Sequence, residues 1–299
     1  MAFIIIDLEF NNLSGIHKCF PDIYNKIPNL KELDLVNEII EIGAIKVDKY
    51  MQPIDKMKVY IKPSVIPVLN PNILDITGIK EENLKNGLSF IEGIEKLKEM
   101  VDEGDIICSW AKDDIVEIIR NANHYNYRDI SWIDQYLDLQ EYTTKILGFK
   151  KSLSLSNALK YLKIKFEGDK LHDALNDAVY EFNVFKHLYN TRAVKKYIVN
   201  NIYEMPALEV DALSTHEIDY DNVKQLCPRC NKKIESEYPF KLMGWRFVSI
   251  GICNKCNNKI LNELIVKRSL GGKIIYQEVL SFINEIEYSR YENRLKDKH

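Results

Sequence analysis

Two carboxylates, Asp7 and Glu9, stand one residue apart at the end of the apolar run Phe3-Ile4-Ile5-Ile6. A short run rich in β-branched residues predicts a strand that is buried on both faces. Because side chains at i and i+2 of a strand share a face, both carboxylates should lie together where this strand leaves the core. Two such charges about 5 Å apart repel by about 3 kcal/mol at an effective dielectric near 20. We therefore expect a divalent metal ion beside them.

A second group, Ser109-Trp110-Ala111-Lys112-Asp113-Asp114, follows an expected strand and leads into an expected helix. Ligands of open α/β sheets collect at the carboxyl ends of strands, so an Asp here could face a site. Either Asp could instead cap the helix, as Asp often does. With two adjacent aspartates, one could cap while the other faces the site, and the spacing does not say which.

A third group, His172-Asp173-Ala174-Leu175-Asn176-Asp177, opens a long expected helix. Five residues of a helix turn through about 500°, so His172 should precede the helix or lie in its first turn, with Asp177 about one turn inside. The positive end of a helix disfavours imidazolium, which keeps a His neutral and able to accept a proton near pH 7. The alternative is a surface His beside a capping Asp.

The last group is a pair of CxxC motifs, Cys227/Cys230 and Cys253/Cys256, with 22 residues between them. Four thiolates in two such knuckles match a tetrahedral, structural Zn²⁺ site. A redox role for either motif is the alternative, which two matched pairs disfavour. In so small a domain the metal should be part of folding.

Composition bounds the class of protein. The 299 residues are 46% hydrophobic, enough for a sizeable core and two domains. The first apolar run is too short for a signal peptide or a membrane span, and the lone Cys19 and Cys108 suggest reduced thiols, so we expect a cytoplasmic protein that does not bind a membrane. Residues 1–223 carry 26 Lys/Arg against 36 Asp/Glu (−10), and residues 224–299 carry 15 against 8 (+7). An acidic front suits metal cations and a basic tail suits a polyanion, the alternative being an ordinary solvated surface.

Hydrophobic periodicity predicts an α/β chain. A meander of three strands comes first, and strands then alternate with helices. The expected strands span about 3–10, 38–45, 57–61, 105–110 and 132–139, and the expected helices about 90–101, 115–122, 140–147, 154–162 and 173–204. The long segment 11–36 leaves the first strand beside Glu9, so it should border the site and could be a lid. With Pro206 opening a linker, the predicted domains are 1–204 and 223–299, joined by 205–222.

Together these motifs resemble the DEDDh-type 3′-to-5′ exonucleases of the RNase H-like fold, the superfamily of DnaQ-like, RNase T and KapD-like proteins. Asp7 and Glu9 are similar to the first motif of that family, Asp114 to the second, and His172 with Asp177 to the HxAxxD of the third. The strand Glu38–Ala44 also agrees, as does the turn Ile76-Thr77-Gly78-Ile79, which members place near the terminal nucleotide. The resemblance covers about residues 1–204.

The resemblance implies a mixed sheet flanked by helices, and a function. Four carboxylates, Asp7, Glu9, Asp114 and Asp177, would hold two Mg²⁺ or Mn²⁺ ions, and His172 would be the general base. The substrates would be single-stranded 3′ ends of RNA or DNA, and the products nucleoside 5′-monophosphates. Near the terminal nucleotide the family would place Thr77, Ile79 and the residues after Glu9. Many relatives have Thr after that Glu; here Phe10-Asn11 stands instead, and Phe10 could stack on the last base.

The tail interleaves basic and aromatic residues, which suits phosphates and bases. These residues are Lys232, Lys233, Lys241, Trp245, Arg246, Phe247, Lys255, Lys259, Lys267 and Arg268. The alternative is that the two aromatics form a small ribbon core. The layout of a DEDDh domain followed by a zinc domain resembles the cell-death-related nuclease of this type. A last helix with Val279, Ile283 and Ile286 on one stripe would pack on the ribbon or on a second copy of the chain.

Two other functions stay open. A non-catalytic nucleic-acid-binding or regulatory protein would have lost a carboxylate or the His, and none is missing here. A proofreading-type subunit would be recruited by another protein through its zinc domain.

Overall fold

The computed structural model describes residues 1–31, 33, 35, 37–168, 171–210 and 213–296. The chain divides into two compact units, Met1–Ile202 and Tyr203–His299.

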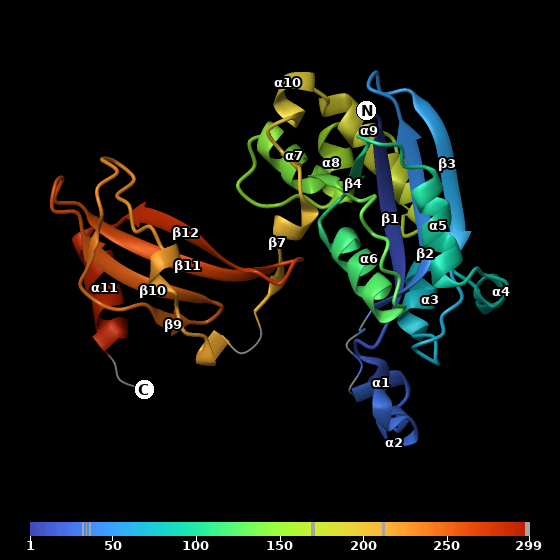
Figure 1. Ribbon diagram of the computed structural model, residues 1–299, viewed down its shortest axis with the longest axis horizontal. Helices are drawn as coiled ribbons and strands as arrows, with labels where there is room; N and C mark the ends of the chain where they lie inside the picture. Colours follow the sequence, from blue (N-terminus) through green and yellow to red (C-terminus); the bar gives the residue numbers. More distant parts are fainter. Residues whose placement is uncertain (32, 34, 36, 169–170, 211–212, 297–299) are drawn as a thin grey trace. The chain divides into compact units, whose positions relative to one another are not determined.

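The first unit is built on a mixed six-stranded sheet in the order β3-β2-β1-β4-β5-β6 (Figure 1). The first three strands form the expected antiparallel meander, β4 and β5 run parallel to β1, and β6 is antiparallel to β5. The strands are β1 (Phe3–Asn12), β2 (Asn37–Val47), β3 (Pro53–Tyr60), β4 (Ile106–Ser109), β5 (Gln135–Asp138) and β6 (Ile198–Val199). The prediction of a mixed, RNase H-like sheet flanked by helices is confirmed.

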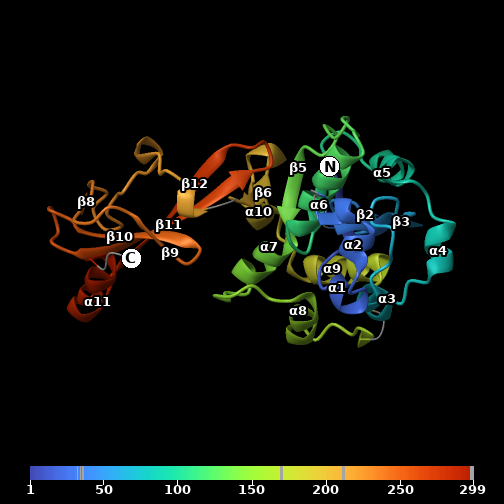
Figure 2. The ribbon, with the colours of Figure 1, turned by 90° about the horizontal axis from the view of Figure 1, so that it is seen from below.

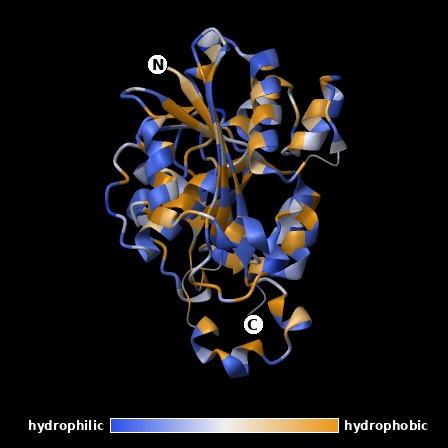
Figure 3. Cartoon of the chain, turned by 90° about the vertical axis from the view of Figure 1, so that its right-hand side faces the viewer, coloured by the Kyte–Doolittle hydropathy of each residue, from blue (hydrophilic) through white to orange (hydrophobic). Residues whose placement is uncertain are grey.

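Helices cover this sheet, and one of them carries part of the site. The side chains of Phe3, Ile5 and Cys108 form a core with Ala178 and Phe185 of the long helix α9. Figure 3 shows that the helices of this unit mix hydrophobic and hydrophilic residues, as expected of helices with one buried side. The helices are α3 (Pro71–Thr77), α4 (Glu81–Lys85), α5 (Phe90–Glu99), α6 (Asp113–His124), α7 (Leu139–Ile146), α8 (Leu155–Tyr161), α9 (Ala174–Leu188) and α10 (Thr191–Val194).

The expected helix over 173–204 is too long. Helix α9 ends at Leu188, and the Asn190 side chain then accepts hydrogen bonds from the backbone N–H groups of Arg192 and Ala193, which starts α10. Asn competes well for such N-cap positions, and this local signal outweighs the apolar periodicity.

The segment between β1 and β2 contains the short helices α1 (Ile16–Cys19) and α2 (Ile23–Lys26) and the 3₁₀ turn Pro28–Lys31. It buries Ile16, Ile23 and Leu30 in a small core of its own. Figure 1 shows α1 and α2 beyond the carboxyl end of β1. Asp7 lies in the middle of this strand and Glu9 in its second half. Glu32, Asp34 and Val36 of the expected lid lie outside the described residues, and a lid function stays a prediction.

The second unit is an antiparallel sheet of β12-β11-β10-β8, with β7 paired to β11 and β9 to β10. Figure 2 shows α11 beside this sheet. The elements are β7 (Pro206–Glu209), β8 (Glu235–Ser236), β9 (Lys241–Met243), β10 (Arg246–Ile252), β11 (Lys259–Ser269), β12 (Ile274–Phe282) and α11 (Glu285–Lys296). The short 3₁₀ turns Ile202–Glu204, Leu213–Thr215 and Tyr220–Asn222 complete the connections.

The expected apolar stripe of a last helix is wrong. Val279 lies in β12, Ile283 precedes α11, and Ile286 is 78% exposed. The helix instead packs through Tyr288, which is buried with Val248 and Ile250 of β10. Residues 206–209, expected in a linker, form β7 of this sheet.

Candidate active site

Strand β1 places Asp7 and Glu9 on the sheet face that α9 covers. Phe3 and Ile5 of the same alternating row are buried against α9, and Asp7 and Glu9 continue that row, both partly buried. In the register with β2, Asp7 pairs with Gly43 and Glu9 with Glu41. The predicted convergence of the two carboxylates on one face therefore follows from strand pairing.

The first turn of α9 lies directly on β2. A Cβ atom added to Gly43 would lie 2.1 Å from the carbonyl carbon of Ala174 and 2.2 Å from the backbone nitrogen of Leu175. Only glycine permits this approach of two backbones. It brings the beginning of α9 beside the strand pair that carries Asp7.

His172 and Asp177 meet at this helix start. The His172 backbone has a φ of +66°, and its N–H donates a hydrogen bond to Asp177 Oδ2 at 2.9 Å. Possible ligand atoms of Glu9, His172 and Asp177 lie within 4.8 Å of one another. The His is exposed and the Asp is 8% exposed, so a solvent-facing base stands next to a buried carboxylate.

A lysine fixes the same helix start from β3. Lys58 Nζ lies 3.1 Å from Glu41 Oε1 and forms a second ion pair with Asp173. Glu41 Oε1 also accepts the backbone N–H of Ala174 at 3.1 Å, and Asp173 caps the helix through the N–H of Asn176 at 3.1 Å. The residue before α9 is therefore tied to two strands.

Helix α6 supplies the next carboxylate. Asp113 is exposed, whereas Asp114 is partly buried and its charge acts on Asp7. Burial, followed by the charge of Asp113, raises the pKa of Asp114 to about 7, although hydrogen bonds from Ser109 and the Leu8 backbone oppose the rise. The charge that acts on Asp7 of β1 is therefore that of Asp114, and not that of Asp113.

These carboxyl groups crowd one another strongly. Burial raises the pKa of Asp7 well above its usual range, and the charges of Asp114, Glu181, Glu9 and Asp177 add to the rise. Burial and the charge of Glu41 raise the pKa of Glu9 to about 8.

The donor set fits divalent cations. Asp177 Oδ1 is buried and has no hydrogen-bond partner among the described residues. Clustered carboxylate oxygens are the ligands that Mg²⁺ and Mn²⁺ prefer, and a bound cation relieves the repulsion that raises these pKa values.

One carboxylate of this region was missed by the sequence analysis. Glu181 lies one helical turn after Asp177 on α9, is fully buried, and raises the pKa of Asp7. The signal was the i, i+4 spacing, which places both carboxylates on one face of a helix whose other buried residues are apolar.

The four residues expected near a terminal nucleotide have structural contacts of their own. Asn11 is 1% exposed; its Nδ2 donates to the Val68 carbonyl and its Oδ1 accepts from the Asn70 backbone, each at 3.0 Å. A bulge between Glu9 and Phe10 shifts the strand register there and leaves Phe10 partly buried.

The other two lie in the turn after α3. Thr77 Oγ1 donates to the Ile73 carbonyl at 2.9 Å and accepts from the Ile79 backbone at 3.2 Å. The Ile79 side chain is buried with Ile40 and Leu84. These contacts shape the turn, and a role in nucleotide binding stays a prediction.

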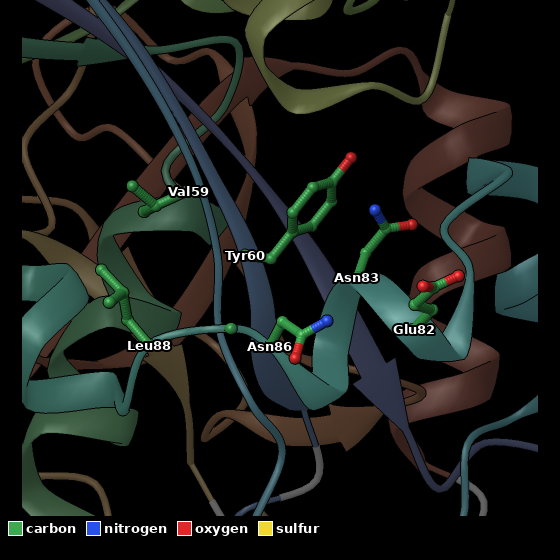
Figure 4. Close-up of a pocket in the computed structure, with 7 residues that line it drawn as sticks. Val59, Tyr60, Glu82, Asn83, Asn86 and Leu88 are labelled. Carbon is green, nitrogen blue, oxygen red and sulfur yellow. The ribbon is translucent and has the colours of Figure 1, made fainter.

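A cavity of about 490 Å³ lies beside the end of β3 (Figure 4). Glu41, the partner of Glu9, pairs on its other side with Tyr60, whose ring lines this cavity. Figure 4 shows the amides of Asn83 and Asn86 on the α4 side of the ring. The cavity is therefore two strands away from the carboxylates.

The second unit holds the four cysteines together. The Sγ–Sγ distances are 3.5 Å for Cys227–Cys256, 3.4 Å for Cys230–Cys253 and 3.9 Å for Cys230–Cys256. Thiolates on one Zn²⁺ with bonds of about 2.3 Å would be about 3.8 Å apart. The backbone N–H of Cys256 lowers the pKa of Cys253 to about 6, which favours the thiolate that zinc needs.

The two knuckles repeat one backbone conformation. The residue after each second cysteine, Asn231 or Asn257, has a positive φ (56° and 51°). Its N–H donates to the carbonyl of the first cysteine, at 2.9 Å from Asn231 to Cys227 and 2.7 Å from Asn257 to Cys253. The predicted zinc ribbon-like cluster is thus present with a geometry that could hold Zn²⁺.

Comparison with known proteins agrees with this fold. The profile of the exonuclease (RNase T) family matches residues 4–185, and the chain belongs to that family. Over 158 residues it is 26% identical to the PolC-type DNA polymerase III of Ureaplasma parvum, which covers 52% of this chain and only 10% of the polymerase.

Solved structures of nucleases are similar to part of this chain. The nuclease domain of 3′hExo, a DEDDh family member bound to rAMP, matches with a TM-score of 0.50 and 16% identity over 62% of this chain and 90% of its own. Cell-death related nuclease 4 (CRN-4) matches with a TM-score of 0.49 and 18% identity over 62% of each chain.

Among the described residues, no helix is long and apolar enough to cross a membrane.

Proposed function

We propose that this protein is a metal-dependent 3′-to-5′ exonuclease that shortens single-stranded RNA or DNA. The observation that carries the proposal is the convergence of Asp7, Glu9, Asp114 and Asp177, from three elements distant in sequence, beside an exposed His172. Membership of the exonuclease family supports a hydrolytic nuclease activity.

The four carboxylates would hold two Mg²⁺ or Mn²⁺ ions, which would supply Lewis-acid activation of water and would stabilise negative charge on the leaving 3′ oxygen of the penultimate nucleotide. His172 accepts the proton of the attacking water. Its exposed position next to Asp177 allows it to reach a water outside the carboxylate cluster. Cleavage on the 5′ side of the terminal phosphate releases a nucleoside 5′-monophosphate.

The terminal nucleotide would lie between Phe10 and the turn of Thr77 and Ile79. Phe10 follows the metal ligands directly and could stack on the last base. Asn11 would support the nucleotide site indirectly, because both polar atoms of its amide already form hydrogen bonds with the backbone of residues 68 and 70.

The second unit would hold the strand upstream of the cleaved end. Trp245 is 60% exposed, and the Arg246 guanidinium lies 5.1 Å from the centre of its ring. An exposed aromatic with a cation suits base stacking and phosphate binding. Phe247, by contrast, is buried and belongs to the core of this unit.

The similarity to a polymerase favours a second candidate, a proofreading-type subunit. The matched segment covers 52% of this chain and 10% of PolC, and the partner that this similarity suggests is a DNA polymerase. Gel filtration with and without nucleic acid would distinguish a protein partner or a homodimer from a monomer that binds the strand itself.

The direct test uses 5′-labelled single-stranded RNA and DNA with Mg²⁺ or Mn²⁺. We expect a ladder that shortens from the 3′ end, is abolished by EDTA and by Asp7→Ala, and releases 5′-monophosphates. Asp114→Asn should abolish activity, whereas Asp113→Asn, the matched control, should retain it. Intact substrate with every metal would refute the proposal and favour a non-catalytic binding protein.

A further inference from the structure

Glu181 is a carboxylate without a partner in the interior of the first unit. Its side chain is 0% exposed, and neither oxygen has a hydrogen-bond partner among the described residues. The backbone amide of Trp110 lies near enough to lower its pKa but forms no hydrogen bond of normal geometry with either oxygen. Buried charged groups are almost always paired or bound to a metal, so this one needs an explanation.

The position of Glu181 is at the floor of the carboxylate cluster. It lies on the sheet-facing side of α9, between Asp177 and the core residues Phe182 and Phe185. Burial, followed by the charges of Asp114, Asp177 and Asp138, raises its pKa. Its own charge in turn acts on Asp7. Glu181 therefore faces the point where β1, α6 and α9 meet.

Two other buried glutamates of this unit each have hydrogen-bond donors on at least one oxygen. Glu117 Oε1 accepts from Arg120 at 2.7 Å and from Asn37 at 3.1 Å. Glu38 accepts three backbone N–H groups, from Ser64, Val65 and Ile66. Glu181 has neither a cation nor a hydrogen-bond donor of this kind within the described structure. Of the three groups whose charges raise its pKa, Asp114 and Asp177 are expected ligands of a cation.

We propose that Glu181 is a fifth carboxylate of the divalent-metal site, to which it would contribute an oxygen ligand. This inference rests on the proposed function, because it assumes that these residues bind a metal. It explains why a helix that is otherwise apolar on its buried face keeps a Glu one turn below Asp177. It also means that the folded protein without metal contains an uncompensated carboxylate.

The test measures metal binding and folding separately from activity. Glu181→Gln keeps the size of the side chain, and Glu181→Met removes its polarity. We expect either variant to bind Mn²⁺ about 10- to 100-fold more weakly by calorimetry. Because the unpaired carboxylate is gone, both should unfold at a higher temperature than the wild type in EDTA, and Mn²⁺ should raise their Tm by less.

Glu117→Gln is the matched control. It changes a buried carboxylate that is already paired, so it should lower the Tm in EDTA and leave the Mn²⁺ affinity unchanged.

Wild-type Mn²⁺ affinity in both Glu181 variants would overturn the proposal. Failure of both variants to fold in EDTA would also overturn it, because such a failure would show that the carboxylate has a partner in the metal-free protein. If the wild type itself bound no Mn²⁺, the proposed function would fail as well. If the wild type bound Mn²⁺ and cleaved while the variants matched it in affinity, only the role of Glu181 would fail.

Discussion

Gly43→Ala tests whether the proposed catalytic residues at the start of α9 are positioned by contact with β2. The added Cβ would lie 2.1 Å from the carbonyl carbon of Ala174, whereas ordinary contact begins at 3.4 Å. The helix start must therefore move by about 1.3 Å, because the obstacle is backbone and not the end of a flexible side chain. His172 and Asp177 would move with it.

The magnitude follows from that displacement. A misplacement of about 1 Å can cost about 100-fold in rate, so we expect kcat to fall by about that factor. Overpacking of this kind costs about 1–3 kcal/mol, which lowers the Tm of a domain of this size by about 2–12 °C. Single-turnover release of the terminal nucleotide, measured well below the Tm of the variant, separates the two effects.

Gly93→Ala is the control for overpacking alone. Its Cβ would lie 2.2 Å from Ile61 Cδ1, the end of a side chain that can rotate away. We expect some loss of stability and little change in kcat. A Gly43→Ala enzyme with kcat within about twofold of the wild type would refute the idea that this contact sets the geometry of the site.

Three further predictions concern charge. In EDTA, the raised folded-state pKa values of Glu9 (about 8) and Asp114 (about 7) mean that the folded state binds protons more tightly than the unfolded state. The stability that these groups contribute is therefore complete below about pH 4 and is lost as the pH rises through 7 to 8. Thermal unfolding from pH 5 to 8.5 should show a falling Tm that Mn²⁺ restores. A Tm that rises with pH would contradict the reasoning. Lys58→Met should lower kcat by about 10-fold or more, because the ion pair with Asp173 is lost. Lys58→Arg should restore part of the lost rate. Lys56→Met, which changes an exposed residue of the same strand, should have the kcat of the wild type in the same assay. Removing residues 203–299, which include the +7 segment 224–299, should weaken binding to single-stranded RNA and flatten its dependence on salt, and an unchanged salt slope would show that the second unit does not contact phosphates.

Much of the site could be predicted because local patterns determine it. Alternation places Asp7 and Glu9 on one face, and helix geometry separates His172 from Asp177 by about one turn. Spacing alone could not choose between Asp113 and Asp114, since both stand in the first turn of α6, and only the resemblance to the family's second motif favoured Asp114. That choice depends on how the helix is rotated against β1, which is a property of tertiary packing.

The parts that failed were decided by partners distant in sequence. Glu181 was missed because a single Glu on a helix usually faces solvent, and only the position of α9 on the sheet buries it. The stripe of Val279 and Ile286 has helical spacing, but the pairing of β12 with β11 extends the strand to Phe282. An apolar run that satisfies two periods is resolved by strand pairing.

The strands that carry no metal ligand still determine the chemistry of this site. Strand β2 contributes Gly43, which lets α9 approach, and Glu41, which accepts the first N–H of that helix. Strand β3 contributes Lys58, whose cation offsets two acidic groups without entering the cluster itself. Within the described part of the chain Asp7 and Glu9 form no ion pair, and the pKa values of both are raised. Strands β2 and β3 thus fix the position of α9, whereas the carboxylate cluster would be neutralised by a bound metal ion. Substitutions in β2 and β3 should therefore change the rate more than the metal affinity. Substitution of Glu181 should change the metal affinity first.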